Sequence, residues 1–231
     1  MSAFRARLAD VKERAEEAAR RGGFAPPTLV AVTKYATQEE VAEAIACGIT
    51  DIGENYPQAL QARMQALASL PHPPRVHLIG SLQSNKVKLV VGKACLIHSL
   101  DRLSLARAID TYSQNIGMDT QVLLEINSGK EVAKGGVFPE DAHALLEQIK
   151  LFPHLRVMGL MTMAPKTATP EESRPYFRAT RKLFETIKAN GLFDTPAPVL
   201  SMGMSHSFEI AAEEGATMIR VGQALFGHAK P

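Results

Sequence analysis

Eight short apolar runs, each rich in Val, Ile and Leu, alternate with longer helical stretches along this chain. Short runs that are apolar on both faces are typical of the buried strands of a parallel sheet. The strands that we expect are 29–33, 50–53, 75–79, 95–98, 121–126, 155–160, 198–201 and 217–221. The helices that we expect between them are 37–47, 56–69, 83–91, 101–116, 139–151, 171–190 and 205–214.

Eight strands that alternate with helices predict an α/β fold, a single-domain (β/α)8 TIM barrel over residues 1–231. A doubly wound open sheet is the main alternative, and it usually has a glycine-rich turn after its first strand. Residues 33–37, with the sequence TKYAT, contain no glycine. We see no sign of a second domain, because the proline-rich pieces of the chain are short enough to be loops.

The N-terminal segment predicts an extra amphipathic helix before the barrel. Phe4, Leu8 and Val11 recur there at steps of three and four, and Gly22-Gly23 end the pattern. The segment lacks the apolar run of a signal peptide and contains acidic residues that transit peptides avoid. No apolar stretch of the sequence is long enough to span a bilayer. We therefore expect a cytoplasmic protein that has no membrane partner.

Composition argues against several other classes of protein. The formal net charge is +2, Trp is absent and basic residues form no long run, so we expect no nucleic-acid partner. Cys47 and Cys95 are far apart and form no CxxC pattern, which indicates unpaired thiols in a reducing compartment. The histidines form neither HxH nor HExxH, so no metal site is expected.

In a parallel barrel the residues just past the strands share one face, and that face holds the site. Here these residues are one lysine, several small polar groups and glycines, without the pair of carboxylates that a glycosidase needs. They are Lys34, 53–55, 80–81, Ser99, 127–128, Met161, 201–205 and 222–223.

Lys34 ends the first apolar run. One interpretation is a surface lysine that extends its amine into water from a strand end. The other is a partly desolvated amine in the barrel mouth, which would attack an aldehyde and form a Schiff base.

Two loops late in the chain are candidates for binding a phosphate. Residues 200–215 run from a strand through a Ser/Gly loop to a helix expected to begin near Ser205, where Ser201 and Ser205 could bind a phosphate. Capping of that helix by Ser205 or Ser207 is the alternative. Residues 220–227 add a glycine loop after the last strand, and barrels often bind phosphate after strands seven and eight. Arg220 lies there, either near a ligand or in a structural ion pair.

Other polar residues near strand ends have two interpretations each. Asn55 could donate to a ligand or only form a turn, and His77 could serve the site or be a satisfied core histidine. Lys130 and Lys134 lie in a long loop, where they could attract an anion or simply be solvated.

Taken together, these segments resemble the pyridoxal phosphate homeostasis family, the YggS/PROSC type. The resemblance covers nearly the whole chain in order, and several motifs together make it specific. The segments are AVTKYAT at 31–37, GENYPQ at 53–58, HLIGSLQSNK at 77–86, INSGKEVAKGG at 126–136, GLMTMAP at 159–165, SMGMS at 201–205 and TMIRVGQALFG at 217–227.

The resemblance implies a barrel similar to the N-terminal domain of alanine racemase, with pyridoxal 5'-phosphate as an internal aldimine on Lys34. It also implies a phosphate loop, Arg220 facing the pyridine nitrogen, and no catalytic residue. A fixed positive charge there disfavours protonation of that nitrogen and makes the ring a weaker electron sink. The predicted cofactor-binding residues are Lys34, Asn55, His77, Ser201, Met202, Gly203, Met204, Ser205, Arg220, Gly222 and Gln223.

The sequence departs from the family pattern at three positions. Gln223 stands where the family usually has Thr, Ser81 replaces a common Pro, and Ser207 replaces a common Asp. These departures leave Lys34 and both phosphate loops in place, and we expect them to affect affinity more than cofactor identity.

The function that we expect is non-catalytic. The protein would bind pyridoxal phosphate reversibly, supply it to other enzymes and support vitamin B6 balance, as a monomer. The alternative is an amino-acid racemase, which would need a second base opposite Lys34; Tyr35, His77 and Lys134 are the candidates. A third hypothesis is a barrel that binds another phosphorylated metabolite without a covalent bond.

Overall fold

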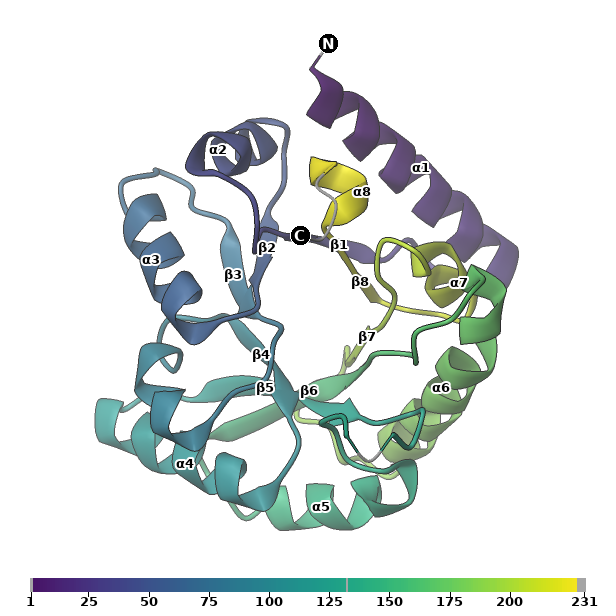
Figure 1. The fold of residues 1–231 in the computed structure, drawn as a ribbon. Helices are drawn as coiled ribbons and strands as arrows, with labels where there is room; N and C mark the ends of the chain where they lie inside the picture. Colours follow the sequence, from purple (N-terminus) through teal and green to yellow (C-terminus); the bar gives the residue numbers. More distant parts are fainter. Residues whose placement is uncertain (1, 132, 228–231) are drawn as a thin grey trace.

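The computed structural model describes residues 2–131 and 133–227. Within these residues, eight parallel strands form a closed barrel in sequence order, which confirms the predicted TIM barrel (Figure 1). The strands are β1 Thr28–Val32, β2 Asp51–Glu54, β3 Arg75–Leu78, β4 Leu96–Leu100, β5 Thr120–Ile126, β6 Leu155–Thr162, β7 Val199–Ser201 and β8 Met218–Val221. Each end lies within one residue of its predicted position, apart from the C-terminal ends of β4 and β6, which extend two residues further.

Helices surround the barrel, and α1 lies beside α7 and α8 on one side of it (Figure 1). The α-helices are α1 Ala3–Gly22, α2 Gln38–Ala46, α3 Pro57–Leu67, α4 Leu103–Ile116, α5 Ala142–Ile149, α6 Arg174–Ala189, α7 Phe208–Glu213 and α8 Gln223–Phe226. The 3-10 helices are η1 Ser84–Leu89, η2 Pro139–Asp141 and η3 Pro170–Ser173.

Two segments differ from the predicted helices. Residues 83–91 were expected to form a helix, and the structure has only the 3-10 turn η1, in a segment where Asn85 disfavours the α-helix interior. The helix expected from Ser205 begins instead at Phe208. Its first residues form a tight turn, in which the Ser207 N–H donates to the Met204 carbonyl at 2.8 Å. The helix α8 was not predicted.

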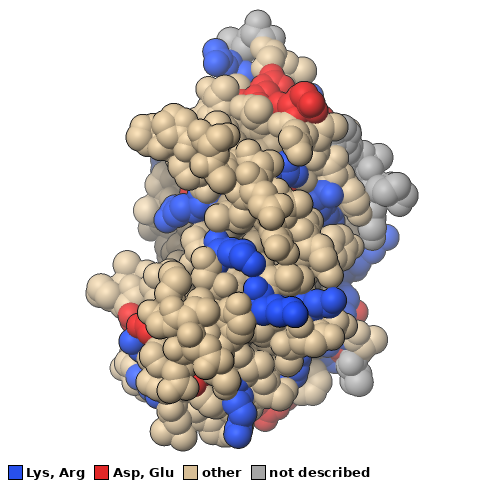
Figure 2. Space-filling model, turned by 90° about the vertical axis from the view of Figure 1, so that its left-hand side faces the viewer, with Lys and Arg blue, Asp and Glu red and all other residues tan. Residues whose placement is uncertain are grey.

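Among the described residues the buried apolar side chains form three clusters. The largest joins the strands to the helices around them. A smaller one contains strand residues only: Val30, Leu96, Leu123, Met161 and Met218. The third lies where α1 packs on α7 and consists of Ala18, Ala19 and Ala212. Figure 2 shows one side of the molecule, the left side of Figure 1, where basic side chains form a band across a mostly uncharged surface. Among the described residues, none of the helices combines the length and apolar character needed to cross a membrane.

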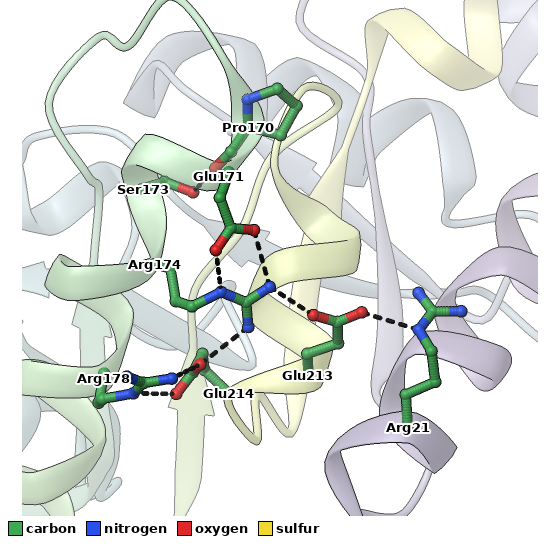
Figure 3. Close-up of polar contacts among 8 residues, drawn as sticks. All are labelled: Arg21, Pro170, Glu171, Ser173, Arg174, Arg178, Glu213 and Glu214. Carbon is green, nitrogen blue, oxygen red and sulfur yellow. Dashed lines mark hydrogen bonds and ion pairs between the residues drawn. The ribbon is translucent and has the colours of Figure 1, made fainter.

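A network of ion pairs ties α6 to α7 and α1 (Figure 3). Arg174 at the start of α6 contacts Glu213 at 2.6 Å and Glu214 at 2.9 Å, both at the end of α7. Glu213 and Glu214 end the segment that runs from β7 through the following loop and α7. The network therefore holds this end of the segment against α6 and α1. The members are Arg21, Glu171, Arg174, Arg178, Glu213 and Glu214.

Arg174→Gln should lower the free energy of unfolding by about 1–2 kcal/mol, since hydrogen bonds to charged groups carry this order of energy. Arg178→Gln is the matched control. Arg178 is more exposed and pairs only with Glu214 of this network, so its loss should cost clearly less than that of Arg174. Urea unfolding at low and high salt measures both, and the difference between the variants should shrink at high salt. Equal losses in the two variants would contradict the central role of Arg174.

Candidate functional site

A pocket with a volume of about 490 Å³ opens at the carboxyl ends of the strands. Its polar lining residues come from loops that follow strands, apart from Arg220 on β8 and Gln223 at the start of α8, as expected for a parallel barrel. The lining comprises Val32, Lys34, Tyr35, Ala36, Asn55, Ile79, Met163, Lys166, Met204, Ser205, His206, Arg220, Gly222, Gln223 and Phe226.

Lys34 lies in the turn that follows β1, at the edge of the pocket. Its side chain is exposed, and its Nζ lies 5.0 Å from the centre of the Tyr35 ring, a cation–π distance. The side chain is therefore accessible to solvent, as in the first interpretation of Lys34, and it also lines the pocket, as in the second.

An ion pair between Arg63 and Glu54, which the sequence does not predict, stabilises the turn that carries Lys34. Glu54, at the end of β2, is almost fully buried and accepts hydrogen bonds from Arg63 Nε at 2.9 Å and from the Thr33 hydroxyl at 2.7 Å. Arg63 Nη2 also donates to the carbonyls of Thr33 and Ala36, at 3.5 and 3.4 Å. These two carbonyls flank Lys34, so the ion pair positions the backbone that carries the amine.

The loops after β7 and β8 are joined at the pocket by Ser205. Its hydroxyl oxygen accepts from the backbone N–H of Gly222 at 3.3 Å and of Ala224 at 3.2 Å. Among the described residues, the N–H groups of His206 and Gln223 have no acceptor. Free N–H groups on two adjacent loops are suited to bind an anion.

Two glycines allow these loops to take their shape. Gly203 has a φ of 90°, and a Cβ there would lie 2.5 Å from the Cβ of Ala211. A Cβ on Gly222 would lie 3.1 Å from the Val32 carbonyl oxygen. A side chain at either position would push the loop away from the elements that support it.

Arg220, on β8, forms part of the pocket floor. It is 4% exposed, and it donates to Ser201 Oγ at 2.6 Å and to the Thr162 carbonyl at 3.0 Å. Burial lowers the pKa of Arg220 to about 10, and the nearby Glu125 opposes that shift. The guanidinium therefore remains charged at neutral pH.

Seven of the eleven predicted residues line the pocket, and four do not. His77 lies in the barrel interior, where both ring nitrogens have partners, so its assignment to the cofactor site is wrong. Ser201 and Met202 are fully buried, and the Ser201 hydroxyl contacts Arg220 and His98 instead of the pocket. Gly203 shapes the loop without lining the cavity.

Two polar lining residues, Lys166 and His206, were not predicted. Their position beyond the sixth and seventh predicted strands was the signal available in the sequence. Lys130 and Lys134 do not line the pocket, and they pair with Glu140 at 2.9 Å and Glu131 at 2.7 Å. Within the described chain, no three His, Cys, Asp or Glu side chains come together as a metal site.

Comparisons with known proteins find relatives that match nearly the whole chain. The family model for the alanine racemase N-terminal domain matches residues 2–230. The pyridoxal phosphate homeostasis protein of Aquifex aeolicus is 42% identical, and the match covers 97% of each chain. PipY of Synechococcus elongatus, solved with PLP bound, has a TM-score of 0.83 and 32% identity, and the match covers 97% of this chain and 100% of PipY.

A more distant structure shares the fold alone. The alanine racemase of Clostridium difficile has a TM-score of 0.78 and 14% identity, and the match covers 99% of this chain and 60% of the racemase. This confirms the predicted likeness to a barrel of the alanine racemase type.

Arg63→Met should lower the free energy of unfolding by about 3–5 kcal/mol, because it leaves the Glu54 carboxylate buried without its counter-charge. The double variant Glu54→Gln with Arg63→Met removes the charge as well, and it should recover a large part of this loss. Urea unfolding of the wild type, both single variants and the double variant measures the coupling. Additive losses would show that the two side chains do not act as a pair.

Glu125, on β5, gives a second test because its ionisation is coupled to folding. Burial, and after it the charge of Asp101, raise the pKa of this carboxyl from 4.5 to about 7 against the opposing charge of Arg220. The folded state thus binds the proton more tightly than the unfolded state. Below the unfolded value both states are protonated, and stability is lost as pH rises through the folded value.

Glu125→Gln should therefore remove about 3 kcal/mol of the decline in stability between about pH 4.5 and about pH 8. The exposed Glu16 of α1 provides the control, and Glu16→Gln should leave the decline unchanged. Urea unfolding at both pH values measures the effect. A Glu125→Gln protein with the same pH dependence as the wild type would contradict it.

Proposed function

The chain belongs to the family of pyridoxal phosphate homeostasis proteins, within the alanine racemase N-terminal domain family, and we propose that it binds pyridoxal 5'-phosphate reversibly. Its role would be to keep the free aldehyde low and to supply the cofactor to other enzymes in the cytoplasm, as a single-domain monomer. The observation that carries the proposal is one pocket that combines an accessible lysine amine with two loops suited to a phosphate.

Lys34 would hold the cofactor covalently. Its amine would supply the nucleophile for the aldehyde of the cofactor, with one water lost on binding and taken up again on release, so the bond would be reversible. The Arg63–Glu54 pair beneath the turn would keep Lys34 directed to the pocket without a direct contact with the ligand.

The loops after β7 and β8 would hold the phosphate. The N–H groups of His206 and Gln223 are the donors that support this assignment, with Gly222 allowing close approach of the backbone. The Ser207 hydroxyl accepts from the Met204 N–H at 3.3 Å, so serine at this position still stabilises the turn. Gln223 lines the pocket, where its amide could replace the hydroxyl that threonine supplies in the family.

The remaining pocket residues would face the ring. Arg220 would lie opposite the pyridine nitrogen, and Asn55 would lie near the ring substituents. A charged guanidinium disfavours protonation of that nitrogen, so the bound ring is a weak electron sink. This suits a carrier better than an enzyme that must stabilise a carbanion.

The candidates for a second base give the racemase alternative little support. Both ring nitrogens of His77 are hydrogen bonded inside the barrel, and Lys134 is paired with Glu131. Tyr35 lies on the same turn as Lys34 and contacts it. None of the three candidates stands across the pocket from the amine.

Lys34→Ala should abolish the yellow absorption band that forms when the purified protein is incubated with pyridoxal phosphate. Lys166→Ala, a lysine on the same pocket, should keep the band. Borohydride reduction followed by peptide mass analysis should place the adduct on Lys34. A colourless wild-type protein would contradict covalent binding and favour a barrel that binds another phosphorylated metabolite.

The carrier role has its own readouts. The loaded wild-type protein should activate an apo-enzyme that requires the cofactor, and Lys34→Ala treated in the same way should not. Racemisation of common amino acids by the loaded protein should stay at the level of Lys34→Ala. Robust turnover that depends on Lys34 would overturn the carrier proposal in favour of the racemase.

A further inference from the structure

A continuous row of polar side chains crosses the interior of the barrel. It begins at Arg220 on β8 and passes through Ser201 on β7, His98 on β4 and His77 on β3 to Asp51 on β2. The distances along it are 2.6 Å from Arg220 Nη1 to Ser201 Oγ, 3.2 Å from Ser201 Oγ to His98 Nδ1, 3.0 Å from His98 Nε2 to His77 Nδ1 and 2.9 Å from His77 Nε2 to Asp51 Oδ1. Each member of the row is at most 4% exposed.

The end of the row away from the pocket is a stabilised carboxylate. Burial raises the pKa of Asp51, but hydrogen bonds from His77, Arg75 and Thr50 outweigh this effect and lower it to about 2. The Arg75 side chain is 63% exposed, so it connects Asp51 to solvent at the opposite end of the barrel from the pocket. The row thus joins a buried anion to the buried cation of the pocket floor.

Only one direction of hydrogen bonding satisfies the row with both imidazoles neutral. Arginine can only donate, so Ser201 Oγ accepts from Arg220 and gives its own hydrogen to His98 Nδ1. His98 then carries its proton on Nε2 and donates to His77 Nδ1. His77 in turn carries its proton on Nε2 and donates to Asp51, which can only accept.

The reverse direction is less favourable. It would need protons on both ring nitrogens of His77, and it would put the His98 proton on Nδ1. The Ser201 oxygen would then accept from both Arg220 and His98. Its own hydrogen could no longer be donated to His98. Burial lowers the pKa of His98 well below its usual value, and His77 and Arg220 act in the same direction, so His98 is neutral in either arrangement. The lost acceptor of the buried Ser201 hydroxyl favours the arrangement in which both rings are neutral.

We propose that Asp51, His77, His98 and Ser201 are positioning residues for Arg220. The row fixes Nη1 of the guanidinium, the Thr162 carbonyl fixes Nη2, and the remaining N–H donors are left for the pocket. Asp51 supplies the distant counter-charge. The claim that Arg220 faces the cofactor ring rests on the proposed function. The claim that the row holds the Arg220 side chain in place does not.

The first measurement is the protonation of the imidazole nitrogens by 15N NMR of histidine-labelled protein at neutral pH. His77 and His98 should both carry the proton on Nε2. A proton on Nδ1 of either ring would overturn the proposed direction.

The second measurement is the rate at which the Arg220 side-chain N–H protons exchange with water. Ser201→Ala removes the acceptor of Arg220 Nη1 and should speed exchange about tenfold or more, because a hydrogen bond to a charged group is lost. His98→Leu breaks the row one residue further on and should also speed exchange, because the Ser201 hydroxyl loses the acceptor that holds its oxygen toward Arg220. Ser201→Ala deletes a single oxygen, which guards against a His98→Leu protein that does not fold. His98→Gln should keep the wild-type rate, because its amide accepts from Ser201 and donates to His77.

Ser113→Ala is the matched control for Ser201→Ala. It removes a buried hydroxyl that bonds to Thr120, outside the row, and it should leave the rate unchanged. Wild-type exchange in both Ser201→Ala and His98→Leu would overturn the positioning role, as would fast exchange in His98→Gln.

With pyridoxal phosphate bound, the 15N resonance of the ring nitrogen is a third readout. It should shift in His98→Leu and stay at the wild-type position in His98→Gln. Failure of the wild-type protein to bind the cofactor would contradict the proposed function, while the exchange rates would still decide the role of the row. An unshifted resonance in His98→Leu would overturn the claim that the row acts on the cofactor.

Discussion

The pairing of β1 with β8 is the constraint on which the site depends. Val30 lies beside Arg220 and Ala31 beside Val221, so the first and last strands of the barrel are neighbours. Because these strands are parallel, the chain leaves both at the same end of the barrel. The turn that carries Lys34 therefore lies next to the loop that contains Gly222. Without closure, the amine and the loops that we propose for the phosphate would lie at opposite edges of a sheet.

Closure also gives the barrel an interior in which polar groups must satisfy one another. Barrel interiors are usually layers of branched apolar side chains, and here part of that space holds two histidines, an aspartate and an arginine. Such groups are costly to bury unless each finds a partner. Among the described residues, every buried side-chain nitrogen and oxygen has one. The network that satisfies them also fixes the orientation of Arg220, so stability and the geometry of the pocket floor have the same source.

The sequence predicts the parts of this arrangement that depend on local pattern. The strand positions follow from short apolar runs, and Lys34, Asn55, Ser205 and Gly222 follow from their place just past strand ends. The later start of α7 depends on the turn between Met204 and Ser207, which competes with the helix for the same residues. That competition has no signature in apolar periodicity.

Partners from distant strands are beyond such reasoning. Glu54 and Arg63 meet because α3 folds back over the end of β2, and His77 meets His98 only across the pair β3 and β4. The pattern of a strand can indicate that an acid or a histidine is buried and needs a hydrogen-bond partner, but it does not identify that partner. The sequence therefore predicts His77 in the pocket, whereas in the structure both of its ring nitrogens have partners inside the barrel.

The contrast between Lys34 and Arg220 bears on how a carrier could work. Arg220 is buried and held by fixed partners, whereas Lys34 is exposed on a turn whose backbone alone is held. A ligand bound between them would contact the fixed Arg220 side chain at one end, and its covalent bond to Lys34 at the other end would be accessible to water. Hydrolysis of a Schiff base at such a position needs no opening of the barrel. Reversible binding then follows from an exposed anchor and a preorganised floor, and no movement of the fold is required.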